Sequence, residues 1–195
     1  MARIIPENAI LIPEHAKEVF KGVIFDVYQW QQQLFDGTTA TFEMLKRPDT
    51  VIALCVKEGR IVFIREQQPG RPEYTRLPGG RVDPGEDWET AIVRECKEEI
   101  GLQFENHRLI HAYQPISKIE WFVAIYLMTD CSAETIPALD AGEKIEIVPM
   151  TFDEAKEHIA QTSDPLNTYT RVVLETASTI DDLLSLPVFR GKVAQ

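Results

Sequence analysis

The segment LPGGRVDPGEDWETAIVRECKEEIGL occupies residues 77–102 and combines a glycine turn, a helix pattern and five glutamates. Asp87 is expected to begin the helix, because its carboxylate can accept hydrogen bonds from free backbone amides, and Gly101 is expected to end it. The predicted helix covers about residues 88–100. Its apolar positions recur at helical spacing and predict one face buried in a core. These positions are Ile92, Val93, Cys96 and Ile100.

Three glutamates of this helix are expected to crowd onto one side. Glu95, Glu98 and Glu99 are related by three and four residues, which places them on adjacent turns. Such a cluster repels itself without a counterion, whereas hard carboxylate oxygens are what Mg²⁺ and Mn²⁺ prefer. Gly80 would let backbone oxygens approach the same ion, and Glu86 could reach toward it. A solvated helix face is the ordinary interpretation of glutamates that stand alone.

The spacing of the fixed residues resembles the Nudix box, G-x5-E-x7-R-E-U-x-E-E-x-G-U, in which U is apolar. All seven fixed positions match, and the preceding Pro78-Gly79-Gly80 resembles the usual lead-in of the family. The matching residues are Gly80, Glu86, Arg94, Glu95, Glu98, Glu99 and Gly101. The resemblance implies an α/β/α sandwich built on a mixed sheet, and a hydrolase of nucleoside diphosphates linked to another moiety.

The resemblance also implies roles for individual residues. Divalent ions, Mg²⁺ or alternatively Mn²⁺, would be held by the box carboxylates and a backbone oxygen of the glycine turn. The implied ligands are Glu86, Glu95, Glu98, Glu99 and Gly80. Glu98 would be catalytic and Arg94 would orient the glutamates. A glutamate on a late loop would act as the general base, and Glu143 fits this position better than Glu146 or Asp140.

The layout before the box is similar to that of the ADP-ribose and nucleoside-diphosphate-sugar pyrophosphatases. In that subfamily, N-terminal strands pack across a homodimer and aromatic side chains stack on the base, so Tyr28 and Trp30 are candidates. Core or interface positions are the alternative for both aromatics.

Several other positions are further candidates for contact with phosphate or sugar. These are Arg65, Arg71, Arg76, Pro115 and Ser117. The subfamily commonly has a glycine and an acidic residue after its proline, but this chain has Ile116 and Ser117. The departure leaves a different nucleotide-sugar preference open. A hydrolase of dinucleoside polyphosphates and a non-catalytic nucleotide-binding protein are the competing interpretations.

Local patterns predict an α+β protein made of antiparallel strands and three helices. After an irregular lead-in over residues 1–20, hairpins are expected at Asp36-Gly37 and Glu58-Gly59. Further strands are predicted over residues 108–116, 119–129 and 144–150. Helices are predicted over residues 151–161 and from Asp164-Pro165 to about residue 184. We expect a dimerising N-terminal part, 1–48, and a Nudix domain, 49–195.

Composition narrows the classes of partner. The 195 residues are 44% hydrophobic, enough for a core, and the formal net charge of −11 disfavours nucleic acid and anionic membranes. No signal region or membrane-spanning stretch is evident, and the three cysteines lack disulfide or zinc spacing. Cys55 and Cys96 are therefore expected as buried free thiols in a cytoplasmic protein that acts on a small nucleotide.

Overall fold

One mixed β-sheet organises the larger part of the chain. The computed structural model describes residues 4–139, 141–162 and 167–193. The sheet has the strand order β11-β6-β5-β10-β8, with β7 beside β6, and its β5–β10 pair is parallel while the other pairs are antiparallel. Its strands are β5 (Thr50–Lys57), β6 (Arg60–Gln67), β7 (Tyr74–Arg76), β8 (Leu102–Tyr113), β10 (Val123–Glu134) and β11 (Lys144–Met150).

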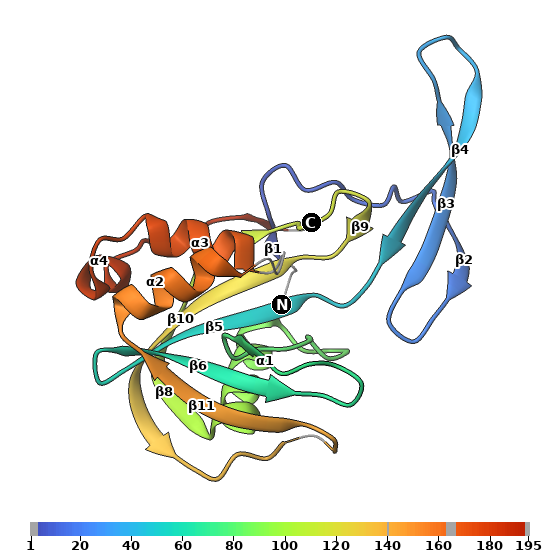
Figure 1. Ribbon diagram of the computed structural model, residues 1–195. Coiled ribbons are helices and arrows are strands. Elements are labelled where there is room, and N and C mark those ends of the chain that lie inside the picture. Colours follow the sequence, from blue (N-terminus) through green and yellow to red (C-terminus); the bar gives the residue numbers. More distant parts are fainter. Residues whose placement is uncertain (1–3, 140, 163–166, 194–195) are drawn as a thin grey trace.

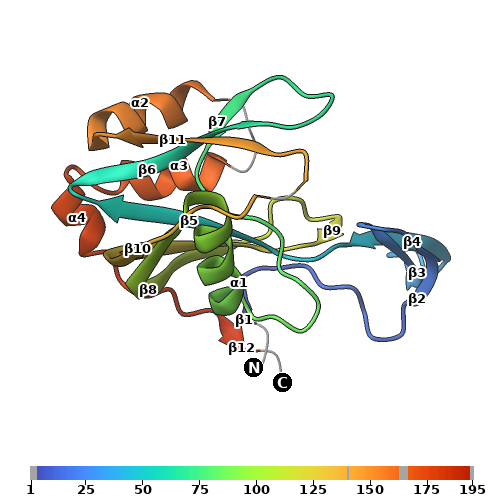
Figure 2. The same ribbon diagram turned by 90° about the horizontal axis from the view of Figure 1, so that it is seen from below.

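Helices cover both faces of this sheet (Figures 1 and 2). On one face lies α1 (Trp88–Glu95), which continues into a π-helical turn, η1 (Cys96–Ile100). On the other face lie α2 (Phe152–Gln161), α3 (Asn167–Glu175) and α4 (Ile180–Leu184). Alternate residues of β5 enter the two cores, with Ala53 facing α1 and Leu54 facing α2 and α3. This arrangement confirms the expected α/β/α sandwich.

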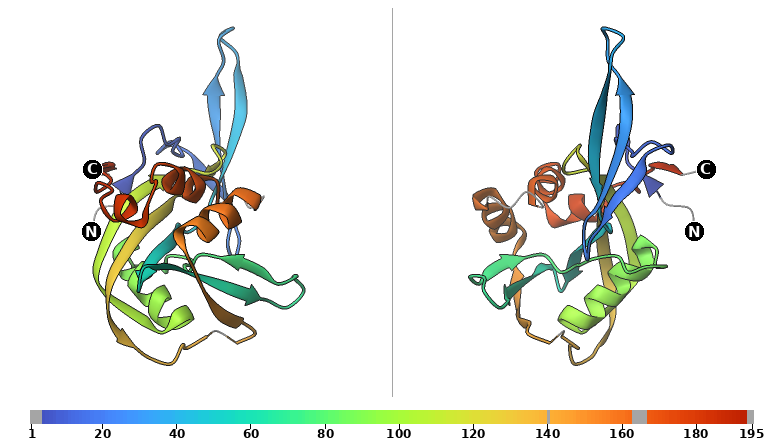
Figure 3. Two further views of the ribbon diagram at one scale, coloured as in Figure 1. Left: turned by 60° about the vertical axis from the view of Figure 1, so that its left-hand side comes forward. Right: turned by 90° about the vertical axis from the view of Figure 1, so that its right-hand side faces the viewer.

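A second, smaller sheet projects from the body (Figure 3). It contains β2 (Lys17–Lys21), β3 (Asp26–Gln33), β4 (Thr39–Lys46) and β9 (Ile119–Glu120). The expected hairpin of β3 and β4 is present, but its loop covers residues 34–38 and is longer than the expected two-residue turn. The loop is closed by the Leu34 amide, which donates to the Thr38 carbonyl at 2.8 Å. The Glu58-Gly59 turn is confirmed, with φ of 51° and 72°.

The lead-in was expected to be irregular, and this expectation is wrong for two short strands. The strand β1 (Ile4–Ile5) pairs with β12 (Lys192–Val193), which brings the two ends of the described chain together. The strand β2 is exposed at every position and is held by its backbone pairing with β3. Because burial contributes little to either strand, neither has the alternation of apolar and polar residues that would predict a strand from sequence.

Other boundaries shift for similar reasons. The strand expected over residues 119–129 is divided between β9 and β10, which belong to different sheets, and β10 extends to Glu134 by pairing with β8. The strand β7, which was not predicted, pairs with β6. The last predicted helix is two helices, because Thr179 caps α4 by accepting a bond from the Asp182 amide. The expected cap at Asp164-Pro165 lies outside the described residues.

Cys55 and Cys96 are buried free thiols, as predicted. Of the helices in the described part of the chain, none has the length and apolar character needed to cross a membrane. The division of the chain at residue 48 stays a prediction.

Candidate active site

The glycine turn, residues 78–80, lies where two central strands separate. Strands β5 and β6 pair only beside their hairpin turn, at Val56 with Ile61 and at Lys57 with Arg60. Further along β5, the backbone of the glycine turn takes the place of β6. The Val51 amide donates to the Gly80 carbonyl at 2.9 Å, and the Ala53 amide donates to the Pro78 carbonyl at 2.8 Å. The sheet thus fixes the turn directly beside the helix that carries the glutamates.

Gly79 allows this close approach. Its φ is +142°, and a β-carbon there would lie 2.1 Å from the Val51 carbonyl oxygen. Only glycine combines that backbone conformation with such a contact.

The glutamate-bearing helix has the predicted ends but an unpredicted last turn. The Asp87 carboxylate accepts a bond from the Thr90 amide at 2.8 Å, and Gly101 ends the helix in the left-handed region, with φ of 66°. Between them the α-helix changes into the π-helical turn η1 at Cys96. Such insertions occur frequently at functional sites, and this one carries both Glu98 and Glu99.

One arginine gathers three of the box glutamates. Arg94 Nε lies 2.9 Å from Glu86 Oε1, while Arg94 Nη1 lies 2.9 Å from Glu95 Oε1 and 2.8 Å from Glu98 Oε2. Arg94 Nη2 also donates to the Arg81 carbonyl at 3.0 Å. The contact with Glu86 lowers the pKa of that carboxyl. These ion pairs hold the carboxylates of two helical turns and of the preceding loop in one cluster.

Glu95 is packed against the glycine turn. A β-carbon on Gly80 would lie 2.3 Å from Glu95 Oε1, so the absent side chain is what makes room for the carboxylate. Burial, followed by the nearby charge of Glu99, raises the pKa of Glu95 to about 7. A cation placed at this carboxylate would favour its charged form.

A second arginine holds Glu99, which is buried. Arg76 Nη2 lies 2.6 Å from Glu99 Oε1, and the Gly79 amide donates to Glu99 Oε2 at 2.8 Å. Arg76 Nε also donates to the buried Glu66. Burial raises the pKa of Glu99 despite these contacts. At Glu66 the balance is reversed, and the pKa is lowered. Burial raises the pKa of this carboxyl, but the charge of Arg76 and the hydrogen bonds from Arg76, Tyr74 and Gln68 together lower it by more.

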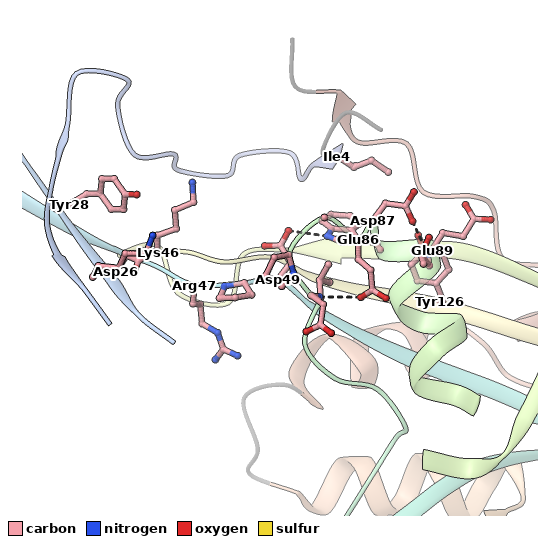
Figure 4. Close-up of a pocket in the computed structure, with 18 of the residues that line it drawn as sticks. Ile4, Asp26, Tyr28, Lys46, Arg47, Asp49, Glu86, Asp87, Glu89 and Tyr126 are labelled. Carbon is pink, nitrogen blue, oxygen red and sulfur yellow. Dashed lines mark hydrogen bonds between the residues drawn. The ribbon is translucent and has the colours of Figure 1, made fainter. Parts of the chain in front are cut away.

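A cavity of about 830 Å³ lies between the projecting sheet and the loop that leads into α1. Figure 4 shows Tyr28 and Lys46 on the side of the N-terminal strands, and Glu86 and Tyr126 on the opposite side. Glu86 belongs both to the cavity and to the cluster around Arg94. The cavity therefore adjoins the box glutamates, although the three on the helix do not line it.

The comparisons with known proteins agree with this geometry. The family described as NUDIX domain matches residues 45–170. The chain belongs to the Nudix family. It is 27% identical over 143 residues to the "ADP-ribose pyrophosphatase" of Bacillus subtilis, covering 71% of this chain and 77% of that protein. It is 22% identical to the "Methanol dehydrogenase activator" of Bacillus methanolicus, covering 83% and 87% of the two chains.

The fold is shared with a solved structure entitled "Crystal structure of ADP compounds hydrolase". The TM-score is 0.67 at 19% identity, and the match covers 84% of this chain and 90% of the other. The sequence-based assignment to the Nudix hydrolases is confirmed, and the similarity to the B. subtilis protein bears out the expected resemblance to ADP-ribose pyrophosphatases. The protein is therefore a Nudix pyrophosphatase.

The residues of the Nudix box fit the divalent ion that the family generally uses, although they do not form a finished cage. Among residues 4–139, 141–162 and 167–193, no three His, Cys, Asp or Glu side chains converge as ligands of one ion. Instead, Arg94 lies between the carboxylates. The donor set is nevertheless chemically suitable, since it offers several carboxylates and the close approach of Gly80 to Glu95.

Sequence reasoning missed two residues beside the cavity. The Asp49 carboxylate accepts bonds from Trp88 Nε1 and from the Phe122 amide, both at 2.9 Å, and so ties α1 to the sheet. The Arg47 guanidinium carbon lies 4.4 Å from the centroid of the Trp121 ring. The only local signal was an Arg-Pro-Asp run between two strands.

The three candidate arginines lie in different environments. Arg65 is directly opposite Glu146 in the pairing of β6 with β11, and its Nη1 lies 2.7 Å from that carboxylate. Arg71 is exposed in the loop between β6 and β7. Arg76 is largely buried among the glutamates. The structure therefore brings only Arg76 to the Nudix box.

The remaining candidates are dispersed. Tyr28 lines the cavity, whereas Trp30 packs against Phe42 with ring centroids 6.1 Å apart and is not among the lining residues. Pro115 and Ser117 lie in the turn between β8 and β9, also outside the lining. Glu143 is half-buried immediately before β11, and Asp140 lies outside the described residues.

Proposed function

We propose that this Nudix pyrophosphatase hydrolyses ADP-ribose or a related nucleoside diphosphate sugar in a reaction that depends on Mg²⁺, with Mn²⁺ as an alternative. The observation that carries the proposal is the cluster of glutamates around Arg94, which adjoins a cavity of about 830 Å³. Water would add across the P–O–P bridge and give a nucleoside monophosphate and a sugar phosphate.

The box residues would hold the ions beside the diphosphate. The proposed ligands are Glu86, Glu95, Glu98, Glu99 and the Gly80 carbonyl. When bound, the ions would offset the charge of the diphosphate and increase the acidity of water. Arg94 keeps the carboxylates together through its ion pairs, and Glu98 is the most exposed of them, with 43% of its side chain accessible.

The other proposed residues act on the substrate. Glu143 would accept the proton of the attacking water at its carboxylate, and its position immediately before β11 leaves it half-buried. Tyr28 would stack on the base from its position in the cavity wall.

Similarity beyond the box supports the choice of substrate. The match to the B. subtilis protein extends over 143 residues, so it includes much more than the 22 positions from Gly80 to Gly101. We also propose that the protein is a homodimer assembled through its N-terminal strands, and that it is located in the cytoplasm.

The test is product analysis on a panel of ADP-ribose, other nucleoside diphosphate sugars and dinucleoside polyphosphates, with Mg²⁺ or with a chelator. We expect AMP and ribose 5-phosphate from ADP-ribose only when Mg²⁺ is present. Glu98→Gln should lower kcat at least ~100-fold, since it removes a charged ligand. Glu105→Gln, at an exposed position of β8, is the matched control.

Each contrary result identifies the part that fails. Equal turnover by wild type and Glu98→Gln rejects the metal ligands. Preference for a dinucleoside polyphosphate rejects the substrate, and tight binding of ADP-ribose without turnover favours a nucleotide-binding protein.

A further inference from the structure

We propose that Arg76 is a positioning residue that, with the buried Glu66, fixes Glu99 against the glycine turn and does not bind phosphate itself. The inference rests on the proposed function in one respect, because Glu99 is taken as one of the metal-binding carboxylates. It goes further by assigning the machinery that sets the position of this carboxylate.

Most hydrogen-bond donors of the Arg76 guanidinium are occupied by acceptors of the protein itself. Its Nε donates to Glu66 and its Nη2 donates to Glu99, at 2.6 Å in the second case. Its Nη1 donates to two backbone carbonyls, that of Leu77 just before the turn at 3.0 Å and that of Gly79 within the turn at 2.8 Å. Four of the five N–H groups of an arginine are thus engaged, and only 19% of the side chain is accessible. Little donor capacity is left for a substrate phosphate.

Glu66 completes the arrangement from the opposite side. It is 0% exposed, and its carboxylate accepts bonds from Tyr74 Oη at 2.9 Å and from Gln68 Nε2 as well as from Arg76. The Coulomb attraction of a carboxylate without access to water holds the guanidinium strongly in place. Glu66 therefore orients Arg76 as Arg76 orients Glu99.

The contacts connect three different elements. Glu66 comes from β6, Arg76 from β7 and Glu99 from η1. Both oxygens of Glu99 already have a donor, one from Arg76 and one from the Gly79 amide, so the carboxylate has a single orientation. Each oxygen retains a lone pair for a cation. Arg94 gathers the three partly buried glutamates, whereas Arg76 sets the buried Glu99 relative to the turn that carries Gly80.

The experiment separates metal binding from substrate binding. Arg76→Lys keeps the charge and loses the forked donor, and the double variant Glu66→Gln/Arg76→Gln removes both buried charges of the pair together. Arg60→Lys, at an exposed position of β6, is the matched control. Mn²⁺ affinity is measured without substrate by the electron paramagnetic resonance of free Mn²⁺, beside kcat and KM for ADP-ribose and a circular dichroism spectrum.

We expect both Arg76 variants to bind Mn²⁺ about 10- to 100-fold more weakly and to lose kcat to a similar extent, as for other partners of metal ligands. KM should stay within about two-fold of wild type, and Arg60→Lys should match wild type throughout. A raised KM with unchanged Mn²⁺ affinity overturns the proposal and makes Arg76 a phosphate ligand. Unchanged Mn²⁺ affinity and kcat, or loss of folding by both variants, overturns it in favour of no role or a purely structural one.

The proposed function can fail separately. A wild-type protein that binds Mn²⁺ but does not hydrolyse ADP-ribose rejects the proposed substrate and leaves the Mn²⁺ test of Arg76 valid. A wild-type protein that binds no Mn²⁺ rejects both proposals.

Discussion

At the scale of single residues, the site depends on a glycine that leaves space as well as on the charged side chains. Gly80 leaves open the position beside its α-carbon that Glu95 Oε1 occupies. Arg94 then holds the partly buried glutamates of the box, and Arg76 holds the buried ones. A change as small as one methyl group should therefore alter the position of a ligand without disturbing the core.

Gly80→Ala tests this arrangement. The new methyl group would lie 2.3 Å from the end of the Glu95 side chain, which can rotate away at small cost. We expect Mn²⁺ affinity to fall about 10-fold, while the free energy of unfolding in urea changes by less than ~1 kcal/mol. Gly70→Ala, where the methyl group meets open space, should leave Mn²⁺ affinity unchanged. Full Mn²⁺ affinity in Gly80→Ala would contradict the role of Glu95.

At the scale of elements, the ends of the box helix are fixed by different kinds of contact. The Asp87 cap is local, since its carboxylate bonds an amide three residues later. The end at Gly101 is tertiary as well, because the Thr135 amide bonds the Gly101 carbonyl at 2.7 Å. The π-helical turn between Cys96 and Gly101 is thereby joined to the segment that follows β10.

Comparing two glycines measures that tertiary contact. Gly101 and Gly59 both have left-handed backbones, with φ of 66° and 72°, so alanine costs about 1 kcal/mol at either position. At Gly101 the methyl group would also lie 2.1 Å from the Thr135 carbonyl oxygen, whereas at Gly59 it meets open space. We expect Gly101→Ala to lower the free energy of unfolding by ~1–3 kcal/mol more than Gly59→Ala, as measured by urea denaturation. Equal losses of unfolding free energy in the two variants would mean that the segment after β10 moves away from the new methyl group at no cost.

At the scale of the whole molecule, the projecting sheet forms one wall of the cavity. The Nudix body supplies the glutamates, but Tyr28 and Lys46 reach the cavity from strands β3 and β4. The exposed apolar side chains of the same region, including Phe20 and Val23, lack cover in the single chain. Substrate recognition and assembly are therefore both predicted to depend on the N-terminal part.

The two candidate aromatics can be ranked by their positions. Tyr28→Ala should raise KM for ADP-ribose by up to ~10-fold with little change in kcat, because the lost stacking contributes about 0.5–1.5 kcal/mol. Trp30→Ala should raise KM less, since Trp30 packs on Phe42 outside the cavity. Steady-state kinetics of both variants provide the comparison, and the reverse order would favour base stacking by Trp30 across a dimer.

The predicted homodimer can be tested at an exposed apolar position. Val23 is 99% exposed in the turn before β3, so Val23→Asp should leave the fold of the single chain intact while introducing a charge into an apolar interface. We expect light scattering after size exclusion to give twice the chain mass of 22.2 kDa for wild type, and a lower mass for the variant at equal concentration. Ile136→Asp, at a 90% exposed position after β10, is the control. A monomeric wild-type protein would contradict the dimer.

Sequence alone determined the features that depend on local spacing. The family followed from the seven fixed positions of the box, Gly80 to Gly101, and the sandwich was expected from that resemblance. The helix ends followed from Asp87 and Gly101. Only the tertiary structure decided the features that depend on contacts between distant segments. Arg65, Arg71 and Arg76 look equivalent in sequence, but the separation of β5 from β6 buries Arg76 between Glu66 and Glu99. Local patterns record which face of an element is apolar, whereas the partner of a buried charge is set by how the elements pack.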